Sequence, residues 1–406
     1  MSLEEELKLQ YEMFEGRGQP AELEGRFDGS DSPRILRPVF LSRHSGYLLD
    51  IDQKIQSNLS FHYLLFLPSA AQFDECLIMG HGFNEAAYVK LFPWAYCLSK
   101  ALHIPVIIFP LSFHINRRPT SWLYLMRSAY RSRKDVVHNR CQSPFNAVVS
   151  QRISENPERF FRGAFQSYCD IMDLIREIIN GDLVVSLAGR KIKPFREDTH
   201  VHFLGYSISG YLYLGLLLLH GQGILRNSRC LLFSSCASGE DINPVSILVI
   251  DQEAFEKALK FYGSGHKRQA STEFLRWFYE TEAGQCFQSL FLEAGKEKLH
   301  ECVQKLVSRL AITADPKDSI FPLEGIVRNL GKGIPTLILD LGRHEFPFNI
   351  SELEGRESRA VISEIRNSYA PSPIYWTSFR KWLGWTTTFF MNSIKLSVGH
   401  GEDSGI

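Results

Sequence analysis

The residue of this 406-residue chain with the clearest chemical signature is Ser207, in the segment Gly205-Tyr-Ser-Ile-Ser-Gly. The segment follows a run rich in β-branched and aromatic residues, 199–206, and precedes an apolar stretch that predicts a helix from Ile208. A serine on such a strand-to-helix turn is exposed and held in a conformation that only small neighbours tolerate. The free N–H groups and positive end of the helix lie beside its oxygen. This pattern predicts a nucleophile; the alternative is an ordinary junction with a capping serine.

The segment resembles the nucleophile elbow, G-x-S-x-G, of the α/β-hydrolase superfamily, with Ser209 in place of the last glycine. Serine is small enough to let a helix and a strand pack closely. The resemblance implies an α/β fold, the α/β-hydrolase fold, in which helices cover a mostly parallel central sheet and a helical cap or insertion is added.

A second motif, His81-Gly82-Phe83, stands where α/β-hydrolases carry the loop that completes the oxyanion hole. Acyl transfer needs two N–H groups aimed at the charge that develops on the carbonyl oxygen. The resemblance implies that the backbone N–H groups of Phe83 and Ile208 are these donors. His81 is a further candidate for substrate binding.

The remaining members of a triad are implied by the order of elements in the superfamily, where the acid follows one strand and the histidine follows the last. Asp318 follows the strand predicted at 309–314, and His344 follows the strand predicted at 334–341. A histidine must reach the serine oxygen, and an acid must hold its ring in the right tautomer. We therefore predict the catalytic set Ser207, His344 and Asp318.

Two alternatives to this set stay open from the sequence. Asp315 competes with Asp318 as the acid, since both follow the same strand. A different set would take Glu345 as the acid and His400, in a polar tail, as the base.

The surrounding elements alternate between strand and helix patterns, which favours a parallel sheet covered by helices. A convincing amphipathic helix is predicted over 157–180, before the serine segment. The other predicted strands are 34–41, 59–67, 75–80, 104–110 and 229–235, with a helix at about 86–102 between two of them.

The alternation of strand and helix patterns is interrupted in two places. Residues of about 111–156 predict an insertion over the upper face of the sheet, and residues of about 239–306 predict a helical cap. A polar lead-in is expected over 1–33, the hydrolase domain over 34–390 and a tail over 391–406.

Composition excludes several classes of protein. Lysine plus arginine and aspartate plus glutamate each number 45, so no basic field is available for nucleic acid. The charged N-terminus does not resemble a signal peptide, and the longest apolar run, 211–219, is too short to span a bilayer. The eight cysteines lack C-x-x-C spacing, so no metal site or disulfide framework is indicated. We expect a cytoplasmic protein.

The resemblance implies a serine hydrolase that cleaves a carboxylic ester or related acyl bond through an acyl-enzyme, with a small-molecule acyl substrate and no metal or organic cofactor. Arg117 and Arg118 follow a predicted strand, and a pair of guanidinium groups there would clamp an anionic substrate group. The alternatives are a non-catalytic binding protein with the same cavity and a lipase that works at a membrane surface.

Overall fold

The computed structural model describes residues 32–88, 90–263, 276, 280–291, 295–348 and 373–399. Within them the core is an eight-stranded sheet in the order β1-β4-β6-β5-β9-β10-β11-β12. These strands span Arg34–Leu36, Leu64–Leu67, Val106–Ile108, Phe73–Gly80, Phe195–Tyr206, Cys230–Phe233, Leu310–Ala314 and Thr336–Ile338.

From β6 to β12 every neighbouring pair of strands is parallel, whereas β4 pairs antiparallel with β6 and with β1. The central strands read as continuous apolar runs because both of their faces are covered. In β5, residues Cys76 and Ile78 face one core, and Leu77 and Met79 face the other. This mostly parallel, helix-covered sheet is the α/β-hydrolase fold, as the sequence predicted.

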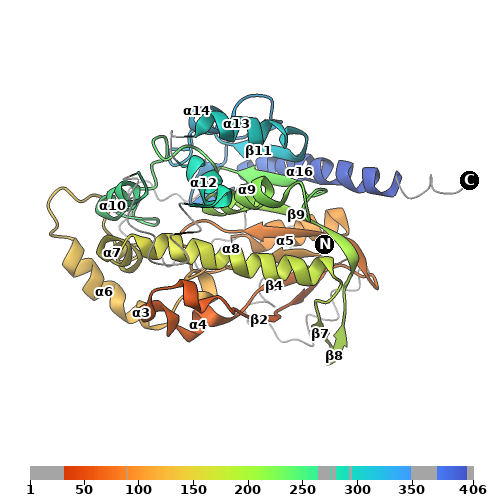
Figure 1. Ribbon diagram of the computed structural model, residues 1–406, viewed down its shortest axis with the longest axis horizontal. Helices are drawn as coiled ribbons and strands as arrows, with labels where there is room; N and C mark the ends of the chain where they lie inside the picture. Colours follow the sequence, from red (N-terminus) through yellow and green to blue (C-terminus); the bar gives the residue numbers. More distant parts are fainter. Residues whose placement is uncertain are drawn as a thin grey trace, which may run out of the picture.

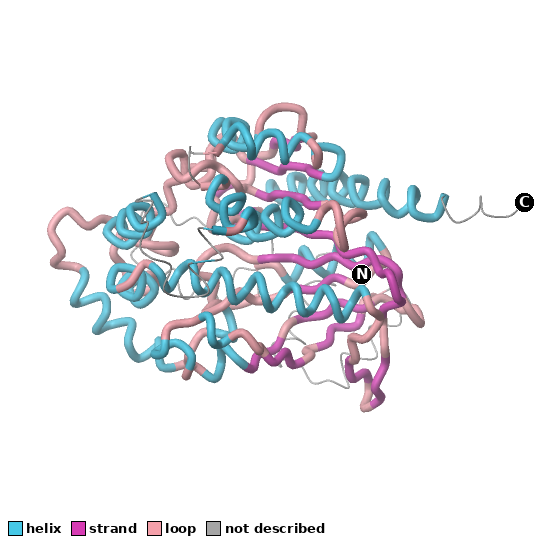
Figure 2. Tube along the Cα trace, viewed as in Figure 1, coloured by secondary structure: helices cyan, strands magenta, loops and turns pink. Residues whose placement is uncertain are grey.

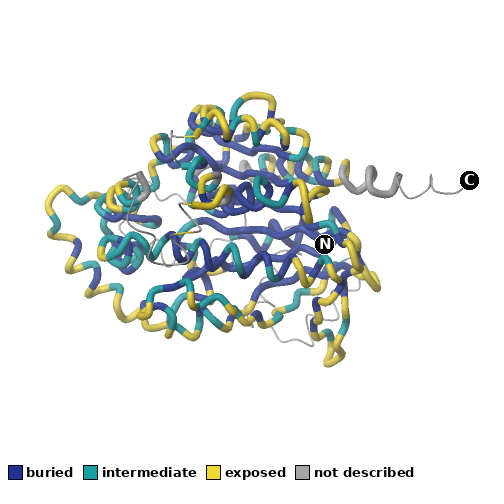
Figure 3. Tube along the Cα trace, viewed as in Figure 1, coloured by how far each residue is buried: buried dark blue, intermediate teal, exposed yellow. Residues whose placement is uncertain are grey.

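Two helical layers cover the sheet. Helices α8 (Glu158–Ile179) and α9 (Ile208–His220) supply the first core, and α5 (Phe92–Leu102) and α16 (Pro373–Gly399) supply the second. Figure 1 shows α8 lying along the sheet in front of β4 and β9, and Figure 2 shows helices on both sides of the strands. The strands form the most deeply buried layer between them (Figure 3).

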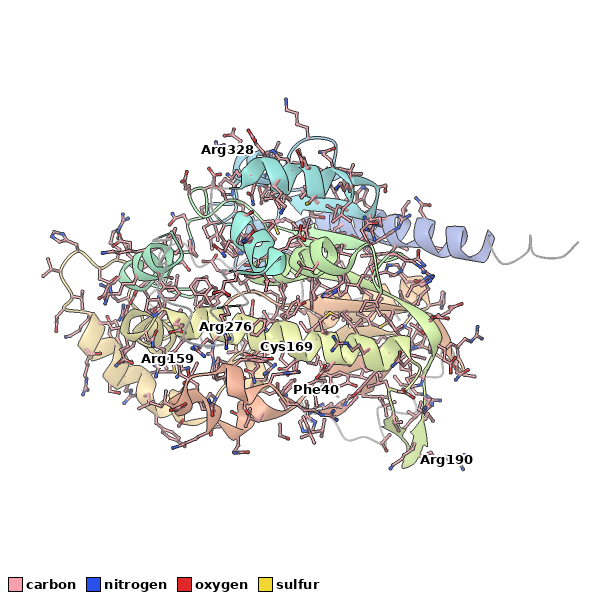
Figure 4. The ribbon with its side chains drawn as sticks, in the orientation of Figure 1. Phe40, Arg159, Cys169, Arg190, Arg276 and Arg328 are labelled. Carbon is pink, nitrogen blue, oxygen red and sulfur yellow. The ribbon has the colours of Figure 1, made fainter. Side chains whose placement is uncertain are left out.

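Several predicted boundaries were wrong. The helix expected from about residue 86 begins at Phe92, because residues 81–88 form a loop and Pro93 is tolerated only in a first turn. The strand β9 begins at Phe195, four residues earlier than predicted. A small hairpin of β7 (Val185–Leu187) and β8 (Arg190–Ile192) was not predicted, and Figure 4 places Arg190 at its tip.

Of the lead-in predicted over 1–33, residues 1–31 lie outside the described residues, as does the part of the predicted tail from residue 400 onward. Helix α16 continues to Gly399, past residue 391, where the predicted tail begins. In the part of the chain that the structure describes, no helix combines the length and apolar character needed to cross a membrane.

The predicted insertion and cap both lie at the carboxyl end of the strands. The insertion holds a 3-10 turn, η2 (Ile115–Arg117), and helices α6 (Ser121–Arg133) and α7 (Ala147–Glu155). The cap segment holds α10 (Gln252–Gly263), α12 (Glu282–Ser289) and α13 (Lys296–Gln304). Helix α10 packs against α7, so α6, α7 and α10 gather at one end of the molecule (Figure 1).

The remaining elements are short. They are β2 (Val39–Leu41), β3 (Ser60–His62), α3 (Asp50–Gln53), α4 (Gln56–Leu59), η1 (Ser45–Tyr47), η3 (Val307–Arg309), α14 (Leu323–Leu330), β13 (Gly342–Arg343) and β14 (Phe346–Pro347).

Where β5, β9 and α9 meet, the backbones approach so closely that side chains are excluded. A Cβ on Gly205 would lie 2.4 Å from the Cα of Gly210, and a Cβ on Gly80 would lie 2.3 Å from the Cβ of Ser209. The serine in place of the last glycine of the elbow pattern is therefore accommodated by a glycine on the neighbouring strand.

This contact generates a prediction for stability. Gly80→Ala should lower the free energy of unfolding by about 1–3 kcal/mol, because the new methyl group overlaps Ser209. Adding Ser209→Gly should recover part of the loss; Tyr213, at 2.9 Å from the same Cβ position, limits the recovery. Urea denaturation measures both variants, with Gly46→Ala as the control, since that glycine has no neighbour within 4 Å. Additive losses in the double variant would contradict the proposed overlap.

Candidate active site

Ser207 occupies a backbone conformation that residues with a side chain rarely adopt, with φ 57° and ψ −125°. Three hydrogen bonds fix the turn. The Ser207 N–H donates to the Phe233 carbonyl at 3.0 Å, and the Ser207 carbonyl accepts from the Gly210 N–H at 3.1 Å and from the Ser235 hydroxyl. The turn thus presents the hydroxyl at the carboxyl end of β9, where the strained conformation is held by its surroundings.

His344 lies in the turn between β13 and β14, and its ring bridges the serine and a carboxylate. The Nε2 atom lies 2.9 Å from Ser207 Oγ, and the Nδ1 atom lies 2.8 Å from Asp318 Oδ2. A neutral ring that donates from Nδ1 to the carboxylate leaves Nε2 as the acceptor for the serine proton. The structure therefore brings together the three residues that the sequence indicated as a triad; their catalytic roles stay a prediction.

Asp318 is oriented by backbone donors. Its Oδ1 atom accepts hydrogen bonds from the N–H groups of Ile320 at 2.8 Å and Phe321 at 2.9 Å, which leaves Oδ2 for the histidine. Burial raises the pKa of the Asp318 carboxyl, but His344 and the two N–H groups outweigh burial and hold the pKa below its usual value. The carboxylate is thus stabilised as an anion beside the imidazole.

The loop that carries His344 is held from two sides. The Tyr206 hydroxyl donates to the His344 carbonyl, and the rings of these two residues stack with centroids 5.4 Å apart. Asp315, the competing acid, accepts from the N–H of Leu341 at 2.7 Å and from the N–H of Lys317 at 2.8 Å. Asp315 therefore joins the loop after β11 to the loop after β12. The carboxylate that contacts the His344 ring is that of Asp318.

Of the alternative set, Glu345 lies within the residues that the structure describes and His400 does not. Glu345 borders the cavity at the serine, whereas His400 lies outside the described residues. The ring that contacts Ser207 is that of His344.

The loop after β5 lies beside the serine. Phe83 and Ile208 both border the cavity into which Ser207 opens. Ile208 is the first residue of α9, where a backbone N–H has no acceptor within its own helix. A Cβ on Gly82 would lie 2.9 Å from the Tyr206 ring, so only glycine fits there. These positions suit an oxyanion hole, and the role of the two N–H groups stays a prediction.

His81 was wrongly predicted to contact substrate. Its ring is completely buried, with Nδ1 2.8 Å from the Gly82 carbonyl and Nε2 accepting from the Leu111 N–H at 2.8 Å. Burial lowers the pKa of His81 to about 4, so the ring is neutral. Both nitrogens are used to join the loop after β5 to the loop after β6, and His81 supports the site from behind.

The prediction that a pair of arginines clamps an anionic substrate group was also wrong for Arg117. This guanidinium is fully buried, 2.8 Å from Asp170 and 3.0 Å from Asn58 Oδ1, and it stacks over the Phe61 ring. A buried charge so fully paired is structural. Arg118 differs, since it borders the cavity and donates to Asn84 Oδ1 at 2.6 Å. Substrate binding by Arg118 stays a prediction.

The cavity at the serine, called here the main cavity, measures about 610 Å³ and is bordered by Ser207, His344, Phe83 and Ile208. Its walls are mostly apolar, and the insertion and the cap together contribute about half of the residues that line it. The insertion supplies Leu123, Met126, Phe145 and Ile153, and the cap segment supplies Ile242, Pro244, Leu248, Val249, Ile250, Phe255, Ala258, Leu259 and Phe291.

Sequence reasoning missed Tyr206 and Ser235, which position the triad. Tyr206 adjoins the serine in the chain, but its bond to the His344 carbonyl spans 138 residues, and nothing in the sequence signals it. Among the described residues, no group of three or more histidine, cysteine, aspartate or glutamate side chains is placed to hold a metal ion.

The lowered pKa of Asp318 has a measurable consequence. Its ionised form stabilises the fold fully above the unfolded pKa of about 4, and this contribution is lost as the pH falls through the folded pKa. Between about pH 5.5 and about pH 3, wild type should therefore lose more free energy of unfolding than Asp318→Asn does. Urea denaturation at each pH checks this, with the exposed Asp135→Asn as the control. Equal losses in wild type and Asp318→Asn would contradict it.

Comparison with known proteins gives a family and distant structural similarity. The chain is 13% identical to the acylaminoacyl peptidase of Pyrococcus horikoshii, with a TM-score of 0.40. The alignment covers 92% of this chain but only 43% of the peptidase. It is 12% identical to vibralactone cyclase, with a TM-score of 0.42, covering 92% of this chain and 84% of the cyclase. For the esterase domain of a Rhodothermus marinus protein, the identity is 10% and the TM-score 0.36, covering 77% and 90%. None of the curated proteins matches the chain. The family described as "Family of unknown function (DUF6051)" matches residues 38–360, and the chain belongs to it.

Proposed function

We propose that this protein is a serine hydrolase that cleaves carboxylic esters through an acyl-enzyme. The observation that carries the proposal is the continuous chain of hydrogen-bond contacts from Ser207 Oγ through His344 to Asp318, at 2.9 Å and 2.8 Å. A strained serine, a histidine and a carboxylate in that order form a nucleophile with its general base.

The reaction follows from this order of groups. Ser207 Oγ attacks the acyl carbonyl while His344 Nε2 takes its proton, and the negative oxygen accepts hydrogen bonds from the N–H groups of Phe83 and Ile208. The bond to the alcohol oxygen then breaks, and His344 returns the proton to the leaving alkoxide. Water attacks the acyl-enzyme in the same manner, releases the acid and restores Ser207. Asp318 holds the ring orientation and stabilises the imidazolium in both halves.

The main cavity indicates the kind of substrate. Its volume of about 610 Å³ lies in the range typical of sites for small molecules, and its mostly apolar walls favour an ester with a large apolar part. Esters are the preferred substrate class because an alcohol is an easier leaving group than an amine. The few charged groups at the wall, Glu85, Lys90, Arg118 and Glu345, offer contacts for a polar end of the molecule.

The first test is hydrolysis of 2-naphthyl acetate and labelling by a fluorophosphonate, which reacts only with an activated serine. Ser207→Ala should abolish labelling and lower kcat by about four orders of magnitude or more, because the nucleophile is lost. His344→Ala and Asp318→Asn should also lower kcat severely, by loss of the base and of its orienting acceptor. Ser128→Ala is the matched control, since Ser128 lies in α6, is not one of the residues that border the main cavity, and donates from its hydroxyl to the carbonyl of Leu125 one turn earlier.

Two results would contradict the proposal. Wild-type protein that neither hydrolyses the ester nor reacts with the fluorophosphonate would favour a non-catalytic protein that binds a ligand in the same cavity. Severe loss of activity in His400→Ala, with activity retained in His344→Ala, would move the base to the alternative set.

A further inference from the structure

Helix α6 exposes a run of apolar side chains. Leu123 is 67% exposed, Tyr124 86% and Leu125 49%, and Figure 3 shows that exposed residues predominate along this helix. Elsewhere among the described residues, exposed large apolar side chains do not follow one another directly in the chain. Single apolar residues are ordinary on a protein surface, whereas a cluster of them marks a site of interaction.

The opposite face of α6 is fixed to the protein. Trp122 and Ala129 are buried in a small core that α6 shares with α7. Arg133, which is also buried, forms an ion pair with Asp251 of the cap segment. Positions 122, 129 and 133 recur at helical spacing and therefore lie on one side of the helix. The helix is held in this orientation, and the exposed side chains stay at the surface.

Basic side chains lie beside the exposed apolar ones. Arg127 and Arg131 follow Leu123 at intervals of one helical turn, and Lys134 directly follows the helix; all three basic residues are exposed. None of the three forms an ion pair with a described residue. Asp135 is the one acidic residue of the sequence between positions 121 and 140. The exposed face of α6 therefore carries a positive charge that attracts a negatively charged partner.

The same face adjoins the main cavity. Leu123 and Met126, one turn apart on α6, both border the cavity, and because Leu123 is also largely exposed it lies at the rim. On the cap segment, exposed Ile247 adjoins Leu248, which borders the same cavity. The hydroxyl group of Ser143 in the insertion donates to the Ile247 carbonyl. The rim thus exposes apolar side chains from both covering segments.

The α6 surface is defined here as the exposed apolar and basic side chains of this helix and the residue after it: Leu123, Tyr124, Leu125, Arg127, Arg131 and Lys134. Its composition suits the surface of an anionic lipid bilayer. Apolar side chains enter the boundary between headgroups and acyl chains, and tyrosine is favoured at that depth. Lysine and arginine remain beside the anionic headgroups.

We propose that the α6 surface binds an anionic membrane surface and that the enzyme takes its ester substrate from the lipid. The second part rests on the proposed function, and the first part does not. The main cavity has mostly apolar walls, so an ester that fits it partitions into lipid. An acidic protein would pair with the cations, but it gives no reason for the exposed apolar face to include the rim of the cavity.

The binding test is co-sedimentation of the full-length protein with two kinds of vesicle. One kind is phosphatidylcholine alone, and the other is phosphatidylcholine with an equal amount of phosphatidylserine. Wild type should bind the mixed vesicles more tightly by about a hundredfold, because each of three cations near an anionic surface contributes about fivefold. Raising the salt concentration should weaken binding to the mixed vesicles, since salt screens exposed charges.

Two variants separate the apolar part of the α6 surface from the charged part. Tyr124→Ser with Leu125→Ser should lower binding to the mixed vesicles by about tenfold or more, because the apolar area that enters the lipid is removed. Arg127→Gln with Arg131→Gln and Lys134→Gln should abolish the preference for phosphatidylserine, because the headgroups then meet no cation.

Matched controls remove the same kinds of side chain elsewhere on the molecule. Val39→Ser with Leu41→Ser removes two exposed apolar side chains from β2. Arg190→Gln with Lys191→Gln and Lys193→Gln removes three exposed cations at the hairpin of β7 and β8, which Figure 1 shows at the opposite end of the molecule from α6. Both controls should bind each kind of vesicle as wild type does.

The activity test compares an ester in water with an ester in lipid. 2-Naphthyl acetate is supplied in solution, and 2-naphthyl laurate is dissolved in the mixed vesicles. Both α6 variants should hydrolyse the acetate as wild type does, since none of their five positions borders the main cavity. They should hydrolyse the laurate more slowly, by the same factor by which their binding to the vesicles falls.

The outcomes separate the two proposals. A wild-type protein that binds neither kind of vesicle, or binds both equally, overturns the inference and leaves the serine hydrolase intact. Wild-type binding by the Tyr124→Ser, Leu125→Ser variant also overturns it, since the apolar face would then not enter the lipid. Unchanged hydrolysis of the laurate by variants that have lost binding overturns the lipid as the source of substrate. Absence of hydrolysis of both esters and of fluorophosphonate labelling overturns the proposed function, whereas the sedimentation result still decides the membrane surface.

Discussion

The geometry of the candidate active site depends on the close approach of three backbones, those of β5, β9 and α9. At this crossing Gly80, Gly205 and Gly210 leave no room for side chains, and the helix can begin directly after the strand. The tight junction forces Ser207 to φ 57°, a conformation that costs free energy by itself. The bonds from Phe233, Ser235 and Gly210 hold it. The free-energy cost of this conformation is offset by hydrogen bonds and packing in the core of the sheet, and the serine is thereby held in one orientation.

The rest of the site is an arrangement of supports around this serine. Asp318 is fixed by two backbone N–H groups, His344 is held at its carbonyl by Tyr206, and Asp315 ties the intervening loops to each other. On the other side, His81 uses both ring nitrogens to join the loops after β5 and β6. In each case a buried polar group has its partners, as such groups require.

The covering layers decide what can reach the serine. The insertion, which ends at about residue 156, and the cap, which begins at about residue 239, are separate segments of the chain, yet they are in contact through α7 and α10 and both border the main cavity. An ion pair between Arg133 and Asp251 joins the two segments, with both side chains buried. The main cavity is therefore formed by both segments together and by neither segment alone.

Much of the architecture was readable from the sequence because it rests on local patterns. Apolar strand runs, the amphipathic helix at α8 and small residues around Ser207 specify the sheet, its cover and the elbow, and the order of motifs along the chain pointed to Asp318 and His344. The short-range pattern did not reveal the hairpin of β7 and β8 or the true start of α5, since loop geometry there overrides helix propensity. The structural roles of His81 and Arg117 could not be predicted from local sequence patterns. Arg117 follows a strand as a ligand-binding arginine would, but its guanidinium group forms a buried ion pair with Asp170 on α8, 53 residues away in the chain. Whether a polar side chain is satisfied by the protein or left for a ligand depends on partners distant in the chain, and only the tertiary structure brings those partners together.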